Sequence, residues 1–233
     1  MRKAKHNKRQ YSNQVKTIYT KIDKRLIPTL PKVAYKGRIV VIETRREMLS
    51  AVSYLRKQRV LGLDTETRPN FDRQARHKVA LLQVAAEGIC FLFRLNRLGL
   101  PQELTDLLGD DKILKIGLSF QDDLRSMHAR ADFKMGRYVE LQRLVKEYNI
   151  QDMSLQKIYA NLFGERISKS QRLSNWEADV LSEAQQQYAA IDAWACIRIY
   201  QQLQTMKRIH NYRVVSDVNP SQLVDKVIWS LLA

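Results

Sequence analysis

The chain has 233 residues, of which 45% are hydrophobic and 27% charged, which is enough for one α/β domain with a sizeable core. It contains no apolar run of about 18 residues, which excludes a membrane-spanning helix, and its basic start lacks the apolar segment of a secretory signal. The formal net charge of +16 favours a polyanionic partner.

The positive charge is concentrated at the start of the chain. Residues 1–36 contain 11 Lys and Arg against one acid, Asp23, whereas the remaining residues contain 29 against 23. Because this segment also lacks sustained apolar periodicity, we expect a basic, flexible extension that is either simply solvated or binds phosphates. The only cysteines, Cys90 and Cys196, lie in apolar surroundings, which favours reduced thiols and a cytoplasmic location. A mitochondrial transit peptide is the alternative, because the first 22 residues contain no acid.

Apolar periodicity predicts one domain over residues 37–207, followed by a C-terminal extension at 208–233 that packs on the domain or trails it. The predicted strands are 39–42, a strand that begins at Val60, 79–85, 89–93, 113–117 and 138–141. The predicted helices are one after the capping box at Thr44, 104–108, 120–128, a helical stretch after Gln142, 155–162 and 182–207. A meander over 60–93 followed by alternating helices and strands indicates an α/β fold, a mixed sheet of five or six strands flanked by helices.

The apolar run that begins at Val60 ends on two acids, Asp64 and Glu66. The period of two along a strand places both carboxylates on one face, where like charges repel unless a cation lies between them. A strand end that runs into a solvated turn explains the same residues without any function. The rest of the chain therefore decides between the two interpretations.

A second acidic site follows the predicted strand 113–117, in the helix that begins near Phe120. Asp123 lies along the buried stripe of that helix, whereas Asp122 is about 200° from Leu124 and should face water. We expect Asp123 to be the functional acid and Asp122 to be solvated. An acid that only complements the helix dipole is the alternative for both.

A third site lies in the long C-terminal helix. Tyr188 and Asp192 are four residues apart, so the phenol and the carboxylate share one face of that helix. The same face carries Ile191 and Ala195, which points Asp192 at or near the core, and a buried Asp is costly unless it is paired or bound to a metal. A core tyrosine with a satisfied hydroxyl is the alternative for Tyr188.

Together, Asp64-x-Glu66, Asp123 behind a strand and Tyr188-x-x-x-Asp192 resemble the three motifs of the DEDD 3′–5′ exonuclease superfamily, in the subgroup with Tyr in the third motif. Within it the chain looks most like the exonuclease domain of the Werner-syndrome helicase and, more distantly, ribonuclease D. The resemblance runs from about Arg38 to Leu203 and does not include the basic start.

This resemblance implies a ribonuclease H-like fold and hydrolysis of a nucleic acid from its 3′ end, with release of nucleoside 5′-monophosphates. It also implies two Mg²⁺ or Mn²⁺ ions per site, held by Asp64, Glu66, Asp123 and Asp192, which clamp the attacking and leaving oxygens. Tyr188 would orient the attacking water, because a phenol with a pKa near 10 is a poor base. A silent nucleic-acid-binding module of the same fold is the alternative.

Several side chains near these motifs are candidates for contact with the nucleic acid, although a solvated surface explains each of them equally. The candidates are Thr67, Arg68, Phe71, Lys78, Lys169 and Arg172, and Trp176 could either stack on a base or belong to the core. The sequence does not distinguish DNA from RNA, and it indicates no particular protein partner.

Overall fold

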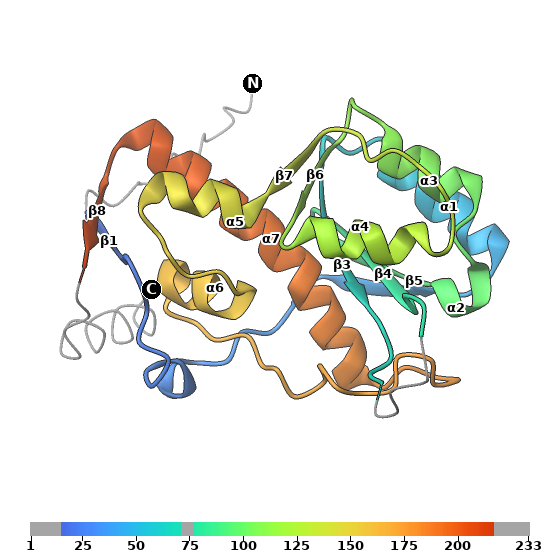
Figure 1. Ribbon diagram of the computed structural model, residues 1–233, viewed down its shortest axis with the longest axis horizontal. Helices are drawn as coiled ribbons and strands as arrows, with labels where there is room; N and C mark the ends of the chain where they lie inside the picture. Colours follow the sequence, from blue (N-terminus) through green and yellow to red (C-terminus); the bar gives the residue numbers. More distant parts are fainter. Residues whose placement is uncertain (1–14, 71–76, 217–233) are drawn as a thin grey trace, which may run out of the picture.

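The computed structural model describes residues 15–70 and 77–216, and its centre is a mixed β-sheet with helices on both faces (Figure 1). The strands run in the order β2-β5-β4-β3-β6-β7. Their bounds are β2 (Arg38–Ile42), β3 (Val60–Glu66), β4 (Leu81–Ala86), β5 (Ile89–Arg94), β6 (Leu114–Gly117) and β7 (Tyr138–Glu140). The predicted α/β fold with a mixed six-stranded sheet is confirmed.

Strands β3, β4 and β5 form the predicted antiparallel meander, in which Asp64 pairs with Gln83 and Val84 with Phe91. The flanking strands pair in parallel: β2 with β5, β6 with β3, and β7 with β6. Parallel neighbours need a crossover connection, and helix α4 (Phe120–His128) supplies it between β6 and β7.

The sheet separates two hydrophobic layers. Side chains from α1 (Arg45–Leu55), α2 (Leu95–Leu98), α3 (Gln102–Gly109) and α4 pack on one face, where they meet Leu61 and Leu63 of β3. The other face is covered by α5 (Leu141–Leu144), the short η2 turn (Val145–Tyr148), α6 (Leu155–Phe163) and α7 (Glu183–Ile209). In Figure 1 the long helix α7 runs obliquely through the picture, with α5 and α6 on one side of it and the sheet on the other.

A close approach of α7 to β3 fixes the position of the long helix. A Cβ atom on Gly62 would lie 2.0 Å from the backbone oxygen of Ala193, so only glycine fits at this crossing. Gly62 precedes Asp64 by two residues and shares its face of β3. The crossing therefore brings the middle of α7 beside the acidic end of β3.

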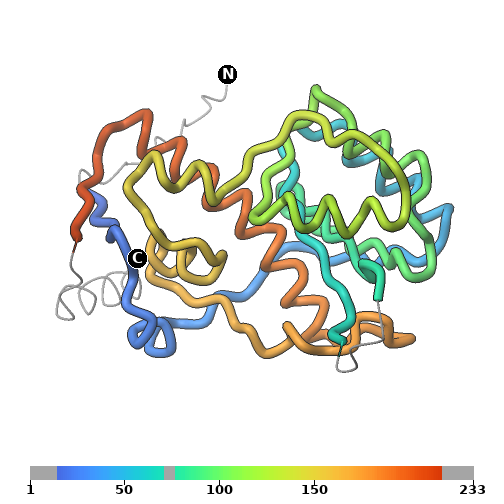
Figure 2. Tube along the Cα trace, in the orientation of Figure 1, coloured from blue at the N-terminus to red at the C-terminus, as the bar shows by residue number. Residues whose placement is uncertain are grey.

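The predicted flexible extension is wrong for residues 15–36, which we call the N-terminal strap. Strand β1 (Lys16–Tyr19) pairs in parallel with β8 (Tyr212–Val215), and the blue strap lies beside the red end of the trace in Figure 2. Ile18 is fully buried in the main core, and the strap continues through a short helical turn, η1 (Ile27–Thr29). Its four-residue strand shows too little periodicity to be recognised before its distant partner is known.

The predicted boundary at residue 36 therefore does not separate a free extension from the described fold. At the other end, β8 belongs to the predicted C-terminal extension and pairs with the strap. Residues 1–14 and 217–233, the outer parts of the two predicted extensions, lie outside the described residues. The sequence patterns also missed β8 and the single-turn helix α2. Over the described ranges, no helix combines the length and the apolar character needed to cross a bilayer.

Packing of the strap predicts that substitutions at two of its residues differ in their effect on stability. Ile18 is 0% exposed and Val15 is 55% exposed. We expect Ile18→Ala to lower the free energy of unfolding by about 2–5 kcal/mol, because it empties a core position. Val15→Ala, the matched control, should change it by less than about 0.5 kcal/mol. Urea denaturation measures both values, and equal values for the two variants would contradict the packed strap.

Candidate active site

The carboxylates predicted from the sequence meet where β3 ends beneath α7. Asp64 and Glu66 lie on the α7 side of β3, as their spacing predicts, and both are half-buried. Asp192 comes from the middle of α7 and is 6% exposed. One carboxylate oxygen from each of the three residues lies within 4.8 Å of the others.

Burial raises the pKa values of all three acids, and repulsion from neighbouring carboxylates adds to the shift of Asp64 and Glu66. The pKa of Asp64 lies well above its usual range because of burial first, and then because of the charges of Asp192, Asp123 and Glu66. Burial and the neighbouring acids raise the pKa of Glu66 to about 9, although Arg172 opposes the shift. Burial also raises the pKa of Asp192 to about 7, against a hydrogen bond with Tyr188 and the charge of Lys169.

A cluster of this kind is suited to hold a divalent cation. Its donors are all carboxylate oxygens, with neither imidazole nor thiolate among the three acids, which fits hard cations such as Mg²⁺ or Mn²⁺. A cation at this point would offset the repulsion among the carboxylates and favour their charged forms.

Asp123 lies at the edge of the cluster rather than inside it. Its Oδ1 accepts a hydrogen bond of 2.6 Å from the hydroxyl of Thr65, which faces the opposite side of β3 from Asp64. Burial raises the pKa of Asp123 to about 6, and its own charge raises the pKa of Asp64 and Glu66. Asp122 has a side chain that is 79% exposed, so it is solvated as expected, and the functional role of Asp123 stays a prediction.

The turn before α4 holds Asp123 at this position. Ser119 adopts a left-handed backbone conformation with φ of 61°, and the carboxylate of Glu140 on β7 accepts hydrogen bonds from the backbone N–H groups of Ser119 and Phe120. These bonds satisfy the exposed donors at the start of the helix. Neither Thr65 nor Glu140 was singled out in the sequence, because both act through contacts between distant elements.

Tyr188 lies one helical turn before Asp192 and forms a hydrogen bond with it, as the spacing predicts. Burial and the neighbouring acids raise the pKa of its phenol, so the hydroxyl remains protonated. Its ring packs against Trp176 with the ring centroids 6.0 Å apart. Trp176 is fully buried, so it belongs to the core and is not available to stack on a base.

Two of the six predicted nucleic-acid contacts lie beside the carboxylates. Lys169 lines the same cavity as Asp64, Glu66, Tyr188 and Asp192, which has a volume of about 240 Å³. Arg172 is exposed on the same loop and lowers the pKa of Glu66 through its charge. Both side chains therefore place positive charge near the acidic cluster.

The remaining predicted contacts are more peripheral. Arg68 is exposed and forms an ion pair of 3.4 Å with Glu177, which also contacts His77. Thr67 is half-buried directly after β3, and Lys78 is exposed before β4. Phe71 lies outside the described residues.

Sequence reasoning missed the wall of the cavity that the N-terminus of α6 supplies. Ser154, Leu155 and Gln156 line it, together with Ile167 and Cys196. Ser154 occupies the N-cap position of α6, but its side chain makes no capping hydrogen bond. Only the folded arrangement brings α6 opposite β3, so the sequence carries no local signal for this wall.

Because the acids repel one another, replacing one of them should stabilise the metal-free protein and weaken its stabilisation by a divalent cation. In EDTA, Asp64→Asn should raise the Tm, since each 1 kcal/mol of relieved repulsion corresponds to about 2–4 °C in a chain of this size. Mg²⁺ or Mn²⁺ should raise the Tm of the wild-type protein more than that of the variant. Differential scanning fluorimetry measures both, with the exposed Asp122→Asn as control. A wild-type Tm that does not respond to either cation would argue against the metal site.

Comparison with known proteins agrees with this geometry. A family model described as 3′-5′ exonuclease matches residues 39–208. The mouse bifunctional 3′-5′ exonuclease/ATP-dependent helicase WRN is 33% identical over 150 residues, which cover 62% of this chain and 11% of that protein. The chain thus spans about a tenth of this relative.

Two solved structures share the fold. The Nibbler EXO domain of Aedes aegypti superposes with a TM-score of 0.69 at 17% identity, over 84% of this chain and 99% of that one. Escherichia coli RNase D, an exoribonuclease, superposes with a TM-score of 0.65 at 20% identity, over 75% and 46% of the two chains. Since the family match extends over the whole segment from β2 to α7 and includes every acid of the site, this chain belongs to the 3′-5′ exonuclease family.

Proposed function

We propose that this protein hydrolyses the phosphodiester bonds of a nucleic acid one at a time from the 3′ end and releases nucleoside 5′-monophosphates. The observation that carries the proposal is the convergence of Asp64, Glu66 and Asp192 with the Tyr188 hydroxyl on one cavity. Repelling carboxylates held together in this way destabilise the fold unless a cation binds them, which favours a functional origin.

The cofactors we propose are two Mg²⁺ or Mn²⁺ ions per site. Asp64, Glu66 and Asp192 would hold them, with Asp123 as the fourth carboxylate, which corresponds to the Tyr-containing DEDD subgroup. When bound, such ions neutralise charge on the phosphate and make a water nucleophilic at neutral pH.

The side chains of the site would orient the reactants around that chemistry. Tyr188 would align the attacking water through a hydrogen bond, because burial and the neighbouring acids raise the pKa of its phenol and keep the hydroxyl protonated. Lys169 and Arg172 offset the negative charge that the acids would otherwise present to a phosphate. The nucleic acid would also contact Thr67, Arg68 and Lys78 as it approaches the carboxylates.

The cysteines bear on the location within the cell. Cys90 and Cys196 are both buried free thiols, which favours a reducing compartment, and we propose the cytoplasm. DNA and RNA are both compatible with the proposed chemistry, and the experiment below distinguishes them.

The test uses a 5′-labelled DNA strand, alone or annealed with a 5′ overhang, and the matching RNA, each incubated with Mg²⁺, Mn²⁺ or EDTA. We expect a metal-dependent ladder that shortens from the 3′ end on gel electrophoresis, and nucleoside 5′-monophosphates on chromatography. Binding of the strands without any ladder would instead indicate a silent binding module of the same fold.

Substitutions in the site should separate the roles of its residues. Asp64→Ala and Asp192→Ala should abolish turnover, since each removes a ligand from the cluster. Tyr188→Phe should retain measurable turnover, at a rate about 10- to 100-fold below that of the wild type, which is the loss expected for one hydrogen bond. Asp122→Ala is the matched acidic control and should keep full activity, because its side chain is exposed. Equal loss for Tyr188→Phe and Asp192→Ala would contradict the orienting role of the tyrosine.

A further inference from the structure

A second cavity adjoins the acidic cluster on the other side of Tyr188. It has a volume of about 370 Å³, which falls toward the lower end of the roughly 300–1,000 Å³ typical of ligand sites. Tyr188 lines both this cavity and the one that holds the carboxylates. A nucleic acid whose 3′ end reaches the carboxylates therefore has a neighbouring space for its next nucleotide.

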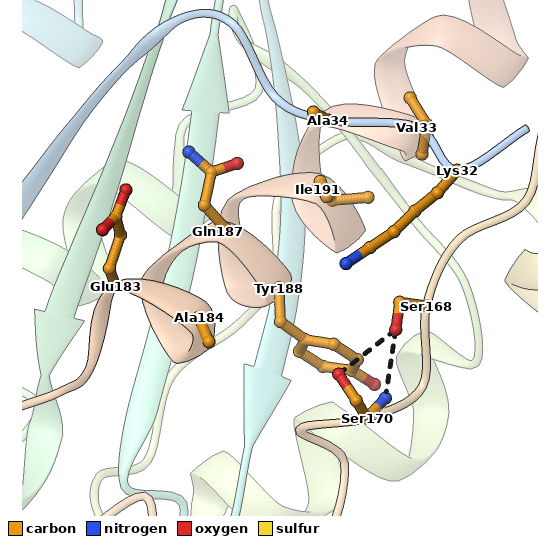
Figure 3. Close-up of a pocket in the computed structure, with 10 residues that line it drawn as sticks. All are labelled: Lys32, Val33, Ala34, Ser168, Ser170, Glu183, Ala184, Gln187, Tyr188 and Ile191. Carbon is orange, nitrogen blue, oxygen red and sulfur yellow. Dashed lines mark hydrogen bonds between the residues drawn. The ribbon is translucent and has the colours of Figure 1, made fainter.

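One wall of this cavity comes from the N-terminal strap. Lys32, Val33 and Ala34 line it, opposite the first turns of α7 (Figure 3). The strap is held there by its backbone: the N–H of Val33 donates to the oxygen of Arg166 at 3.0 Å, and the N–H of Arg166 donates to the oxygen of Pro31 at 2.9 Å. These strap residues precede the segment matched by the family model, which begins at residue 39.

The lining combines an apolar surface with a polar edge. Val33 and Ile191 are buried, and Ala184 adds a further apolar contact. At one end Figure 3 shows the Lys32 side chain extending toward Ser168 and Ser170, whose hydroxyls are 3.2 Å apart, while Glu183 lies at the opposite edge. Among the described residues, the Lys32 ammonium has no ion-pair partner. A cation beside two hydroxyls suits a phosphate, and the apolar surface suits the face of a base.

The chemistry of a 3′ end decides which nucleotide this cavity receives. The bond to be hydrolysed must lie at the carboxylates, and the terminal nucleotide beyond it ends in a hydroxyl. Every other phosphate of the strand therefore lies on the 5′ side of the reacting bond. A second phosphate site beside the cluster can only take the nucleotide that precedes the terminal one.

We propose that Lys32, Ser168 and Ser170 bind the phosphate on the 5′ side of the penultimate nucleotide, whose base lies on the surface formed by Val33, Ala184 and Ile191. This assignment rests on the proposed function. It makes the strap part of the substrate site, and it makes a single-stranded 3′ end the preferred substrate, because a base in this cavity cannot remain paired.

The test compares two substrates that differ only on the 5′ side of the reacting bond. One is a single-stranded oligonucleotide, and the other is the p-nitrophenyl ester of thymidine 5′-monophosphate, in which p-nitrophenol replaces all upstream nucleotides. Lys32→Gln should lower kcat/KM for the oligonucleotide about 10-fold, the loss of one charge-assisted hydrogen bond, and leave the ester unaffected. For the oligonucleotide, log(kcat/KM) should also fall less steeply with log[salt] in this variant, by the slope that corresponds to about one lost phosphate contact.

Two matched variants make the result specific. Lys36→Gln removes an exposed lysine from the same strap outside the cavity and should leave both substrates unaffected. Ala184→Leu fills the apolar surface with a good helix former and should impair the oligonucleotide alone. Equal loss on both substrates with Lys32→Gln, or no loss on either, would overturn the proposal.

A binding measurement keeps the two proposals separable. If the wild-type protein hydrolyses neither substrate, the proposed exonuclease activity has failed. Fluorescence anisotropy with a labelled oligonucleotide then tests the cavity alone: Lys32→Gln should weaken binding about 10-fold relative to Lys36→Gln. Equal Kd values for these two variants would reject the cavity as a nucleotide site.

Discussion

Helix α7 crosses strand β3 so closely that the position between them, Gly62, admits no side chain. The helix presents small residues to the strand, Ala189 and Ala193 among them, both fully buried. One turn further, the thiol of Cys196 donates to the backbone oxygen of Asp192 at 3.3 Å and lies 3.9 Å from that of Leu63. With larger side chains at this crossing the helix would stand farther from the sheet, and Asp192 would not reach Asp64 and Glu66.

The same proximity creates an electrostatic conflict within the fold. Three carboxylates share a small space, and the charges of Lys169 and Arg172 on the neighbouring loop only partly oppose their repulsion. The surrounding packing must supply the free energy that holds them together. It does so with buried layers on both faces of the sheet and with a hydrogen-bonded turn that fixes Asp123 through Glu140.

Residues with strong local patterns were predictable from the sequence. The strands of the meander, the capping box of α1 and the division between Asp122 and Asp123 all depend on periods of two or 3.6 that a single segment displays. What the sequence could not supply are partnerships across long separations: β1 with β8, Thr65 with Asp123, and Ser154 with the cavity. Each of these depends on where another element lies, so the basic strap looked like solvated chain although most of its apolar residues are buried.

The pairing of β1 with β8 also constrains how the molecule forms. The side chains of Thr17 and Arg213 are joined by a hydrogen bond across 196 residues of sequence. Closing so long a loop carries an entropic cost that is recovered only when the intervening sheet and helices are already in place. During synthesis the strap leaves the ribosome before the sheet and helices, yet it cannot pair with β8 until α7 and β8 have also emerged. A segment that is made before the sheet is thus among the last parts of the described fold to reach its final position.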